Sequence, residues 1–414
     1  MLGKRNNPDG PAARRPNVLF LLSDQERSWE WLPPSVQLPW RQRLQAEGLT
    51  LQNHWAHSSP CSPSRATIQT GLHVPQHDVP DNCGLPWQKS LDPGIATIGS
   101  VLRDAGYHSG YHGKWHVSYQ ATPEDMTSYG YSDWQGNDVH WMGLAGTGQR
   151  FDPIIADYAA SWLRDNAAAA EPWFMTVGLV NPHDVMWYPI DQPAYQAKNP
   201  QEVEFVRNIL GQADLLPDDM EAVPAFELDY DEVVEKLPEN FDDDLISKPA
   251  SQRAWRWDQQ HNLFGYIDPD DTKAWLRHLN YYVKLYELAD QSLGKILQAL
   301  EDSGAWDDTI IIFTSDHGDM CGSHGLRSKG PFIYDEIMRV PGVIRAPGVT
   351  SPGTSTTSLS SHVDLARTIC GLAGVEPPAS MKGKDLGPLL RSPQSAVRDH
   401  VLFCHATAHM TTVR

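Results

Sequence analysis

Residues 309–319 read TIIIFTSDHGD, a continuous apolar run that ends in two aspartates and a histidine. Residues 17–25 read NVLFLLSDQ and repeat the arrangement directly after Pro16. Short apolar runs without polar alternation are typical of strands that are buried on both faces, as in a parallel sheet. We therefore predict that residues 17–22 and 309–314 are central strands.

Helical patterns alternate with such strands along the chain. Apolar residues recur at helical spacing in three segments, residues 97–105, 151–164 and 271–301. Gly106 and Gly304 follow two of these segments and are typical helix stops. Residues 173–180, WFMTVGLV, form a further apolar run. The alternation predicts an α/β fold with a large, mostly parallel central sheet that helices cover on both faces.

The composition is globular, with a strong acidic balance. The chain has 414 residues, with 33 Lys and Arg against 52 Asp and Glu, and a formal net charge of −19. Nucleic-acid binding requires a basic face, so this balance argues against a nucleic-acid partner. It also disfavours docking on an anionic membrane, and the longest apolar runs are too short to span a bilayer.

One segment carries much of this charge. Residues 201–245 contain fifteen Asp and Glu, with Arg207 and Lys236 as their basic residues. The segment is rich in proline and interrupts the α/β alternation, so we predict a surface insertion at about residues 190–260. Its aromatic and acidic side chains could contact the organic part of a substrate, such as a cationic alcohol. The alternative is a solvated acidic surface over core aromatics.

The termini and cysteines suggest a location. The five cysteines are odd in number and lack the spacing of a disulfide framework, which fits a reducing compartment. Residues 1–15 carry charge without an apolar stretch behind them, unlike a signal peptide, and we predict a flexible N-terminal segment there. A cytoplasmic location is the corresponding expectation.

Two of the predicted strands end in side chains that could bind a metal ion. Asp24 and Gln25 follow one strand, and Asp316 and His317 follow the other. Ligands collect beyond the carboxyl ends of strands in open α/β sheets, so the four side chains converge if the strands are neighbours. Three oxygen donors and an imidazole suit a divalent cation. The aspartates could instead cap the turns that follow the strands.

A candidate nucleophile lies in residues 59–71, SPCSPSRATIQTG, where Cys61, Pro63 and Arg65 form the pattern C-x-P-x-R. Pro63 suits the first turn of a helix, which would place Cys61 at a helix N-terminus that favours an anion. Arg65, one turn later, could reach back to the same point. Cys61 could act as a thiolate nucleophile, or it could be a buried structural cysteine.

The pattern C-x-P-x-R is the maturation signal of the formylglycine-dependent sulfatases of the alkaline-phosphatase superfamily. The chain resembles that family along nearly its whole length from residue 16. Further motifs match in the family's order: NVLFLLSDQ at 17–25, YHGKWH at 111–116, NPHD at 181–184, TSDHGDMCGSHGLRSKG at 314–330, IMRVPGVIRAPG at 337–348 and SHVDLARTICGLAGVEPP at 361–378. One such motif is a weak signal, whereas the series in order is specific.

The resemblance implies a chemistry centred on Cys61. A maturation enzyme would oxidise Cys61 to formylglycine, and one hydroxyl of the hydrated aldehyde would attack sulfur. The resulting covalent sulfate ester would collapse when the second hydroxyl loses its proton. A divalent metal would activate the hydroxyl and orient the sulfate. Its implied ligands are Asp24, Gln25, Asp316 and His317.

The resemblance also implies roles for the other motif residues. Arg65 would hold the nucleophile, and Lys114 and Lys329 would bind the sulfate from two sides. His116 would contact the nucleophile and serve as the base for the collapse step. His183 would bind the substrate and protonate or hydrogen-bond the leaving-group oxygen.

Two further residues have two interpretations each. Asn82 resembles a substrate-contacting asparagine of some members, and a surface turn residue is an equal alternative. His324 also recurs in the family's pattern, either as a structural hydrogen-bonding residue or as a substrate contact.

The metal-ligand pattern departs from that of the most familiar arylsulfatases. Those have paired aspartates on the first strand and Asp-Asn after the last. Gln25 and His317 stand here instead, as in choline-sulfatases and phosphonate monoester hydrolases, while Lys114 and His116 are retained as in sulfatases. Calcium is the metal that we favour for an oxygen-rich site, and the imidazole also admits manganese, magnesium or zinc.

The resemblance implies domain limits. Residues 16–378 would form the sulfatase α/β catalytic domain. Residues 379–414 would be the start of a smaller C-terminal subdomain, which we expect to be incomplete.

We therefore expect an enzyme, a sulfuric ester hydrolase that releases inorganic sulfate and an alcohol or phenol from a small-molecule ester. Its maturation partner would be a formylglycine-generating enzyme. The alternatives are phosphonate or phosphate ester hydrolysis at the same site and, from another class, a non-catalytic binding relative. The nucleophile, the metal carboxylates and Lys329 are all present, which argues against a non-catalytic relative.

Overall fold

An eight-stranded sheet forms the centre of the computed structural model, which describes residues 14–136, 143–212, 221–261, 264–330, 332–405 and 410–413. Its strand order is β5-β4-β6-β1-β7-β8-β2-β9. The two strands with acidic ends, β1 (Asn17–Asp24) and β7 (Thr309–Ser315), are parallel neighbours, with Ser23 level with Ser315. Their carboxyl ends therefore lie side by side, as predicted.

The other strands complete a mostly parallel sheet. On one side of β1, parallel pairing joins β6 (Trp173–Pro182), β4 (His108–Gly113) and β5 (Asp133–Gln135). On the other side, β8 (Gly342–Arg345) is antiparallel to β7 and to β2 (Leu49–Leu51), and β9 (Thr354–Thr356) is parallel to β2. The predicted fold class is confirmed.

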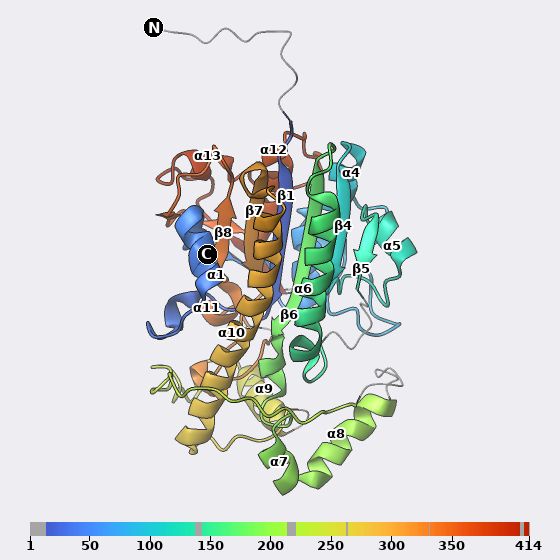
Figure 1. Cartoon of the computed structure of the whole chain (residues 1–414). Coiled ribbons are helices and arrows are strands. Elements are labelled where there is room, and N and C mark those ends of the chain that lie inside the picture. The colour runs from blue at the N-terminus through green and yellow to red at the C-terminus, as the bar shows by residue number, and fades with distance from the viewer. Residues whose placement is uncertain are drawn as a thin grey trace, which may run out of the picture.

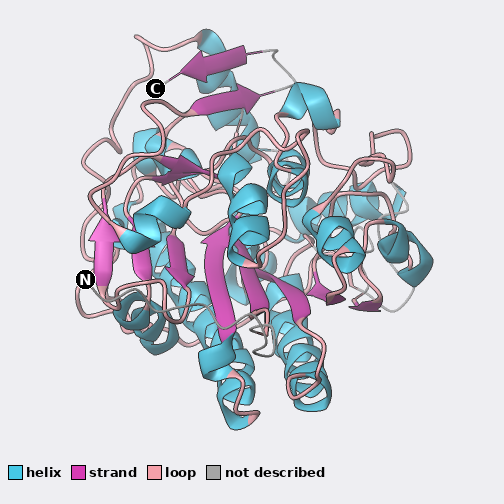
Figure 2. Cartoon of the chain, turned by 90° about the horizontal axis from the view of Figure 1, so that it is seen from above, coloured by secondary structure: helices cyan, strands magenta, loops and turns pink. Residues whose placement is uncertain are grey.

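Helices cover both faces of the sheet (Figures 1 and 2). In the view of Figure 1, α6 (Thr147–Asn166) and α10 (Thr272–Asp302) lie in front, packed on each other and on β6, with α1 (Pro39–Glu47) beside α10. The opposite face carries α2 (Cys61–Thr70), α4 (Ile98–Asp104) and α12 (Leu365–Leu372).

The alternation of side chains along β1 explains the two layers. Leu19 and Leu21 join the hydrophobic core formed with α6 and α10, whereas Phe20 and Leu22 join the core formed with α2, α4 and α12. Successive strand residues point to opposite faces, so a continuous apolar run supplies both cores. Gly106 and Gly304, with φ of 88° and 74°, follow the ends of α4 and α10 in the left-handed conformation that helix stops adopt.

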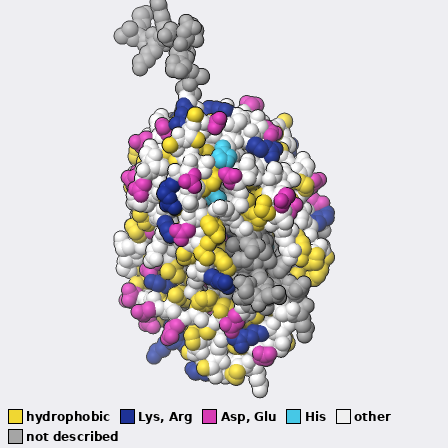
Figure 3. All heavy atoms as spheres, turned by 45° about the vertical axis from the view of Figure 1, so that its right-hand side comes forward, with side chains coloured by type: hydrophobic (Ala, Val, Ile, Leu, Met, Phe, Trp, Pro, Cys, Tyr) yellow, Lys and Arg dark blue, Asp and Glu magenta, His cyan; other side chains and the backbone are white. Residues whose placement is uncertain are grey.

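The predicted insertion contains α7 (Pro193–Lys198), α8 (Pro200–Gln212) and α9 (Ala250–His261). Residues 221–249 between them form neither helix nor strand, but Val223, Val234 and Phe241 are buried. The acidic side chains described in residues 221–245 are exposed, except that Asp243 is partly buried. The insertion is therefore an acidic surface anchored by apolar side chains. On the face shown in Figure 3, side chains of both charges are interspersed among hydrophobic ones.

Smaller elements complete the described chain. They are α3 (Val74–His77), α5 (Pro123–Ser128), α11 (Asp335–Met338), α13 (Gly387–Arg391), the pair β3 (His54–Trp55) and β10 (Ser360–Ser361), and the antiparallel pair β11 (Leu402–His405) and β12 (Met410–Val413). The C-terminal subdomain and the flexible N-terminal segment stay predictions. Among the described residues, no helix combines the length and apolar character needed to cross a membrane.

Candidate active site

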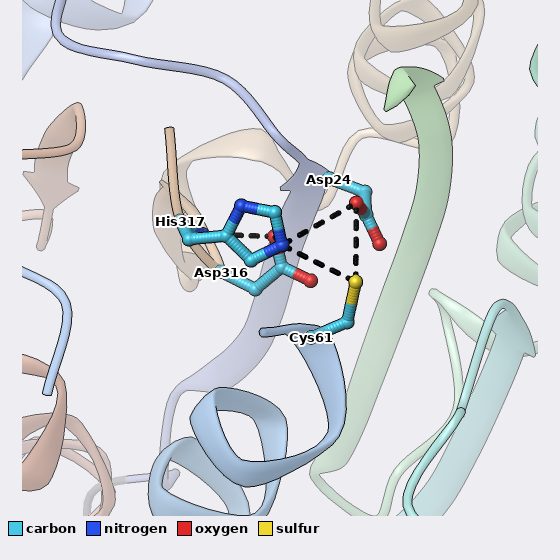
Figure 4. A group of neighbouring side chains, drawn as sticks. All are labelled: Asp24, Cys61, Asp316 and His317. Atoms are coloured by element: carbon cyan, nitrogen blue, oxygen red, sulfur yellow. Dashed lines mark hydrogen bonds and ion pairs between the residues drawn. The ribbon is translucent and has the colours of Figure 1, made fainter. Parts of the chain in front are cut away.

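Four buried side chains meet beyond the carboxyl ends of β1 and β7 (Figure 4). Asp24 ends β1, Asp316 and His317 follow β7, and Cys61 is the first residue of α2. One potential ligand atom from each side chain lies within 4.8 Å of the others. Cys61 Sγ is 3.2 Å from His317 Nε2 and 3.7 Å from Asp24 Oδ1. The fold thus brings the candidate nucleophile to the candidate metal ligands.

Arg65 orients the two carboxylates. Its Nε donates to Asp316 Oδ2 at 2.7 Å, and Nη2 donates to Asp24 Oδ2 at 3.0 Å. Its Nη1 donates to the carbonyl of Lys114 at 2.7 Å. The Oδ1 atoms of Asp24 and Asp316 lie 4.0 Å and 3.7 Å from His317 Nε2. Each carboxylate therefore offers one oxygen to the guanidinium and turns the other toward His317.

The His317 ring is set to act as a ligand through Nε2. Its Nδ1 lies 2.9 Å from the carbonyl oxygen of Gly318, which can only accept a hydrogen bond. The proton therefore belongs on Nδ1, which leaves the lone pair of Nε2 facing Cys61 and the aspartates. Two carboxylate oxygens and one imidazole nitrogen around one point fit a divalent cation.

Lysines add positive charge around Cys61. Lys329 Nζ lies 3.2 Å from Cys61 Sγ and donates to Gln25 Oε1 at 2.7 Å. Lys114 Nζ pairs with Asp24 Oδ2 at 2.7 Å. Burial alone would raise the pKa of Asp24, but Lys114, His183 and Arg65 hold that pKa well below its usual range. Burial and Asp24 also raise the pKa of the Cys61 thiol, but Lys329 and Lys114 outweigh them and lower it. The site is built to hold negative charge.

Two histidines flank this group. His183 follows β6 at the start of a short 3-10 helix (His183–Trp187). A Cβ atom on Gly143 would lie 3.5 Å from the His183 ring and 3.8 Å from Lys114 Nζ, so both border the same glycine. Burial, then Lys329 and Lys114, lowers the pKa of His183 well below its ordinary value. Burial, then Lys114 and Arg65, does the same for the pKa of His116. Burial and the neighbouring cations therefore both disfavour the charged form of each imidazole.

The structure separates the two residues with open interpretations. Asn82 Oδ1 accepts from the backbone N–H of Ser62 at 3.2 Å, so this partly exposed side chain lies one residue from the nucleophile. The His324 ring instead faces the insertion, with Nδ1 2.7 Å from Asp243 Oδ2 and Nε2 3.1 Å from Asn240 Nδ2. These contacts link His324 to the acidic segment and fit the structural interpretation of this residue.

Sequence reasoning missed the residues that support this group. Ser64, inside C-x-P-x-R, donates through Oγ to the carbonyl of Asp316 at 2.5 Å. Asp319 accepts from Gln25 Nε2 at 2.6 Å. Asp184 accepts from the backbone N–H groups of Gly148 and Gln149 at the start of α6. Ser64, Asp319 and Asp184 each lie inside a motif, and that position is the only sign of their importance in the sequence. Their hydrogen-bond partners are distant along the chain, so the contacts could not be predicted.

Comparison with known proteins assigns the family. A family model described as Sulfatase matches residues 16–375. The chain belongs to the sulfatase family. The Escherichia coli K12 sulfatase YidJ is 28% identical over 405 residues, which cover 90% of this chain and 71% of that protein. The N-acetylglucosamine-6-O-sulfatase of Bacteroides thetaiotaomicron is 26% identical over 427 residues, covering 93% and 73%.

A solved structure confirms the fold of this sulfatase. The phosphonate monoester hydrolase of Agrobacterium radiobacter matches with a TM-score of 0.67 and 24% identity, covering 94% of this chain and 80% of that one. The alkaline-phosphatase-like fold expected from the motifs is confirmed, and the chain is a sulfuric ester hydrolase. Around Cys61 the structure gathers Asp24, Gln25, Arg65, Lys114, Asp316, His317 and Lys329 through linked contacts, with Asn82 and His183 beside them, and His116 follows Lys114 by two residues.

Proposed function

We propose that this sulfatase cleaves its ester at sulfur, with formylglycine formed from Cys61 as the nucleophile. The observation that carries the proposal is the position of Cys61. It opens α2 inside C-x-P-x-R, it is buried, and its Sγ lies 3.2 Å from both Lys329 Nζ and His317 Nε2. A formylglycine-generating enzyme would be the maturation partner.

We propose that Asp24, Gln25, Asp316 and His317 hold one divalent metal, with calcium favoured over manganese, magnesium or zinc. The hydrated aldehyde formed at Cys61 would supply the attacking hydroxyl, and a metal held by these residues would supply Lewis-acid activation of that hydroxyl. Arg65 keeps the carboxylates oriented throughout. Lys114 and Lys329 stabilise the negative charge that develops on the sulfate in the transition state.

The two histidines suit proton transfer. A neutral imidazole can accept a proton, so His116 is the proposed base for release of sulfate. His183 lies beside Lys114, and the negative charge of a bound ester would raise the pKa of His183, against the lowering by burial and the lysines. We propose that His183 donates its proton or a hydrogen bond to the leaving-group oxygen. Asn82 would contact the substrate beside α2.

The alcohol that carries the sulfate group is to be found by testing several classes of ester. The similarity to an N-acetylglucosamine-6-O-sulfatase supports sulfated amino sugars as the first class to test. The exposed acidic residues of the insertion support a cationic alcohol such as choline as a second class. Aryl sulfates are a third class, and a phosphonate monoester tests the alternative chemistry.

The test is the mass of the proteolytic peptide that contains Cys61, from protein co-expressed with a formylglycine-generating enzyme. We expect the mass for CHO in place of CH2SH at Cys61 and an unchanged thiol at the buried Cys83, which lies outside the motif. Converted protein should hydrolyse at least one of the sulfate esters. An unmodified Cys61, in cells that fully mature a control sulfatase, would overturn the proposal. Faster cleavage of the phosphonate than of every sulfate would favour the alternative.

A further inference from the structure

A continuous chain of short contacts leads from Cys61 into the protein behind it. Lys329 Nζ lies 3.2 Å from Cys61 Sγ and 2.7 Å from Gln25 Oε1. Gln25 Nε2 donates to Asp319 Oδ2 at 2.6 Å, and Asp319 Oδ1 accepts from the backbone N–H of Cys321 at 2.6 Å. Gln25 and Asp319 are completely buried, so water does not replace these partners.

The chemistry of the two neighbours fixes the orientation of the Gln25 amide. An ammonium group can only donate hydrogen bonds, and the Asp319 carboxylate accepts them. The carboxamide satisfies both when Oε1 faces Lys329 and Nε2 faces Asp319. The reversed amide would bring two donors together at Lys329 and two acceptors together at Asp319, and such mismatches are costly in a buried site. Asp319 therefore determines which end of Gln25 meets Lys329.

The position of Lys329 depends on that contact. A lysine side chain has four rotatable bonds and a single compact charge, so it needs a fixed acceptor to remain in one place. Gln25 Oε1 is that acceptor, at 2.7 Å from Lys329 Nζ. The oxygen has two lone pairs, so holding Lys329 leaves one acceptor position free for the ligand role expected of Gln25.

We propose that Asp319 is a positioning residue, which holds Lys329 against the nucleophile through the carboxamide of Gln25. The inference rests on the proposed function, in which Lys329 binds the sulfate group. Asp319 touches neither substrate nor nucleophile in this scheme. Its effect on catalysis should therefore disappear when Lys329 can no longer contribute.

A double-mutant cycle tests this dependence in the full-length, converted protein. The variants are Asp319→Asn, Lys329→Met and the combination. The probes are 4-nitrophenyl sulfate for kcat and KM and inorganic sulfate for the dissociation constant. We expect Asp319→Asn to lower kcat/KM by about 10- to 100-fold and to weaken sulfate binding, as loss of a supporting hydrogen bond typically does. In the Lys329→Met background, the same change should have little further effect.

Matched variants separate positioning from general stability. Asp364 is another buried carboxylate, which accepts from the backbone N–H groups of Ser361 and Lys384, so Asp364→Asn should lower stability without a Lys329-dependent change in sulfate binding. Asp319→Ala removes the acceptor of Gln25 Nε2 and leaves the proposed metal ligand Gln25 in place. It should reproduce the Lys329-dependent loss even if Asp319→Asn folds poorly.

Two results would overturn the inference, and they are distinguishable. If the parent protein hydrolyses sulfate esters but the losses from Asp319→Asn and Lys329→Met multiply independently, the positioning role is wrong and the proposed function stands. If converted parent protein neither hydrolyses nor binds sulfate, the proposed function fails and the inference fails with it.

Discussion

Arg65 is the residue on which the geometry of the active site depends most directly. Its guanidinium contacts Asp24, Asp316 and the carbonyl of Lys114 at 2.7 to 3.0 Å. The guanidinium holds its donors in a fixed planar fork over three nitrogens, so it can span separated acceptors, whereas a lysine has its donors on a single nitrogen. One buried side chain therefore aligns the ends of three strands and the first turn of α2.

Arg65→Ala should destabilise the protein and inactivate it. Removing one partner from a buried ion pair leaves uncompensated charge, which costs about 3–5 kcal/mol. We also expect loss of esterase activity in the molecules that remain folded, because Asp24 and Asp316 lose their orientation. Urea unfolding gives the stability, and kcat normalised to folded protein gives the activity.

Arg41 provides the matched control. Its guanidinium is equally buried between Glu26 and Asp290, outside the active site. Arg41→Ala should cost a similar amount of stability while the folded fraction keeps its kcat. Equal losses of kcat in Arg65→Ala and Arg41→Ala would show that Arg65 contributes to stability alone. If Arg65→Ala does not fold, Arg65→Lys takes its place in the comparison with Arg41→Ala.

Some residues of the active site could be predicted from the sequence, and others could not. Asp24, Cys61 and Asp316 were found because motifs and strand ends mark them. Asp319 and Ser64 were missed because their roles depend on side-chain directions after folding, which spacing does not encode. His324 remained open for the same reason, since its partner Asp243 lies 81 residues away in an irregular segment.

The elements that sequence patterns predicted well are those with uninterrupted apolar faces. β1, β6, β7 and α10 were all expected from such runs. β4 was not, because its sequence HSGYHG has no apolar run. It is nonetheless an inner strand, paired with β5 and β6, and Trp162 of α6 packs closely against it: a Cβ atom on Gly110 would lie 3.2 Å from that ring. Tertiary packing outweighs strand propensity at this position.

The end of β4 yields a prediction about how Lys114 is placed. Gly113 has φ of 87°, and a Cβ atom on it would lie 2.2 Å from the carbonyl oxygen of Gly178 in β6. Gly113→Ala should therefore cost more than the roughly 1–2 kcal/mol of a left-handed residue alone, because the backbones must also separate. Since Lys114 follows directly, kcat should fall as well. Urea unfolding and steady-state kinetics measure the two effects.

Gly304→Ala is the control that measures conformational strain without a steric clash. Its φ is 74°, but no heavy atom would lie within 4 Å of a Cβ there. Gly304→Ala should show the strain cost alone and keep the parent kcat. If Gly113→Ala costs no more than Gly304→Ala and leaves kcat unchanged, the close approach of β4 and β6 does not position Lys114.

Buried carboxyl groups, as well as the two hydrophobic cores, set the stability of the whole molecule. Behind His183, buried carboxyl groups tie β6 to α6: Asp152 accepts from Val180 and Asn181, and Asp184 accepts from the start of α6. Burial, the largest cause, raises the pKa of Asp152 to about 7 and that of Asp184 to about 8. These groups make the stability of the whole fold depend on pH.

The direction of that dependence follows from proton binding. An unfolded aspartate has a pKa near ~3.9, so between about pH 4 and 8 the native state binds more protons than the unfolded state. Stability then falls as pH rises. Buried histidines act oppositely: burial lowers the pKa of His54 and His278 to about 3, so the unfolded state binds more protons and their stability contribution is gained until the unfolded imidazoles are deprotonated, at about pH 7.5. The contribution of one carboxyl group is therefore isolated by comparing the parent with a variant that lacks it.

We predict that the free energy of unfolding of the parent, relative to that of Asp184→Asn, decreases by about 2 kcal/mol between pH 6.5 and 8.5, since a bound proton that is released contributes about 1.4 kcal/mol per pH unit. The amide in Asp184→Asn has no proton to lose, and its oxygen can still accept from α6. Asp307→Asn, at an exposed carboxyl, should keep the parent slope. Urea unfolding at pH 6.5, 7.5 and 8.5 measures all three proteins. A parent slope in Asp184→Asn would contradict the assignment of the buried proton to Asp184.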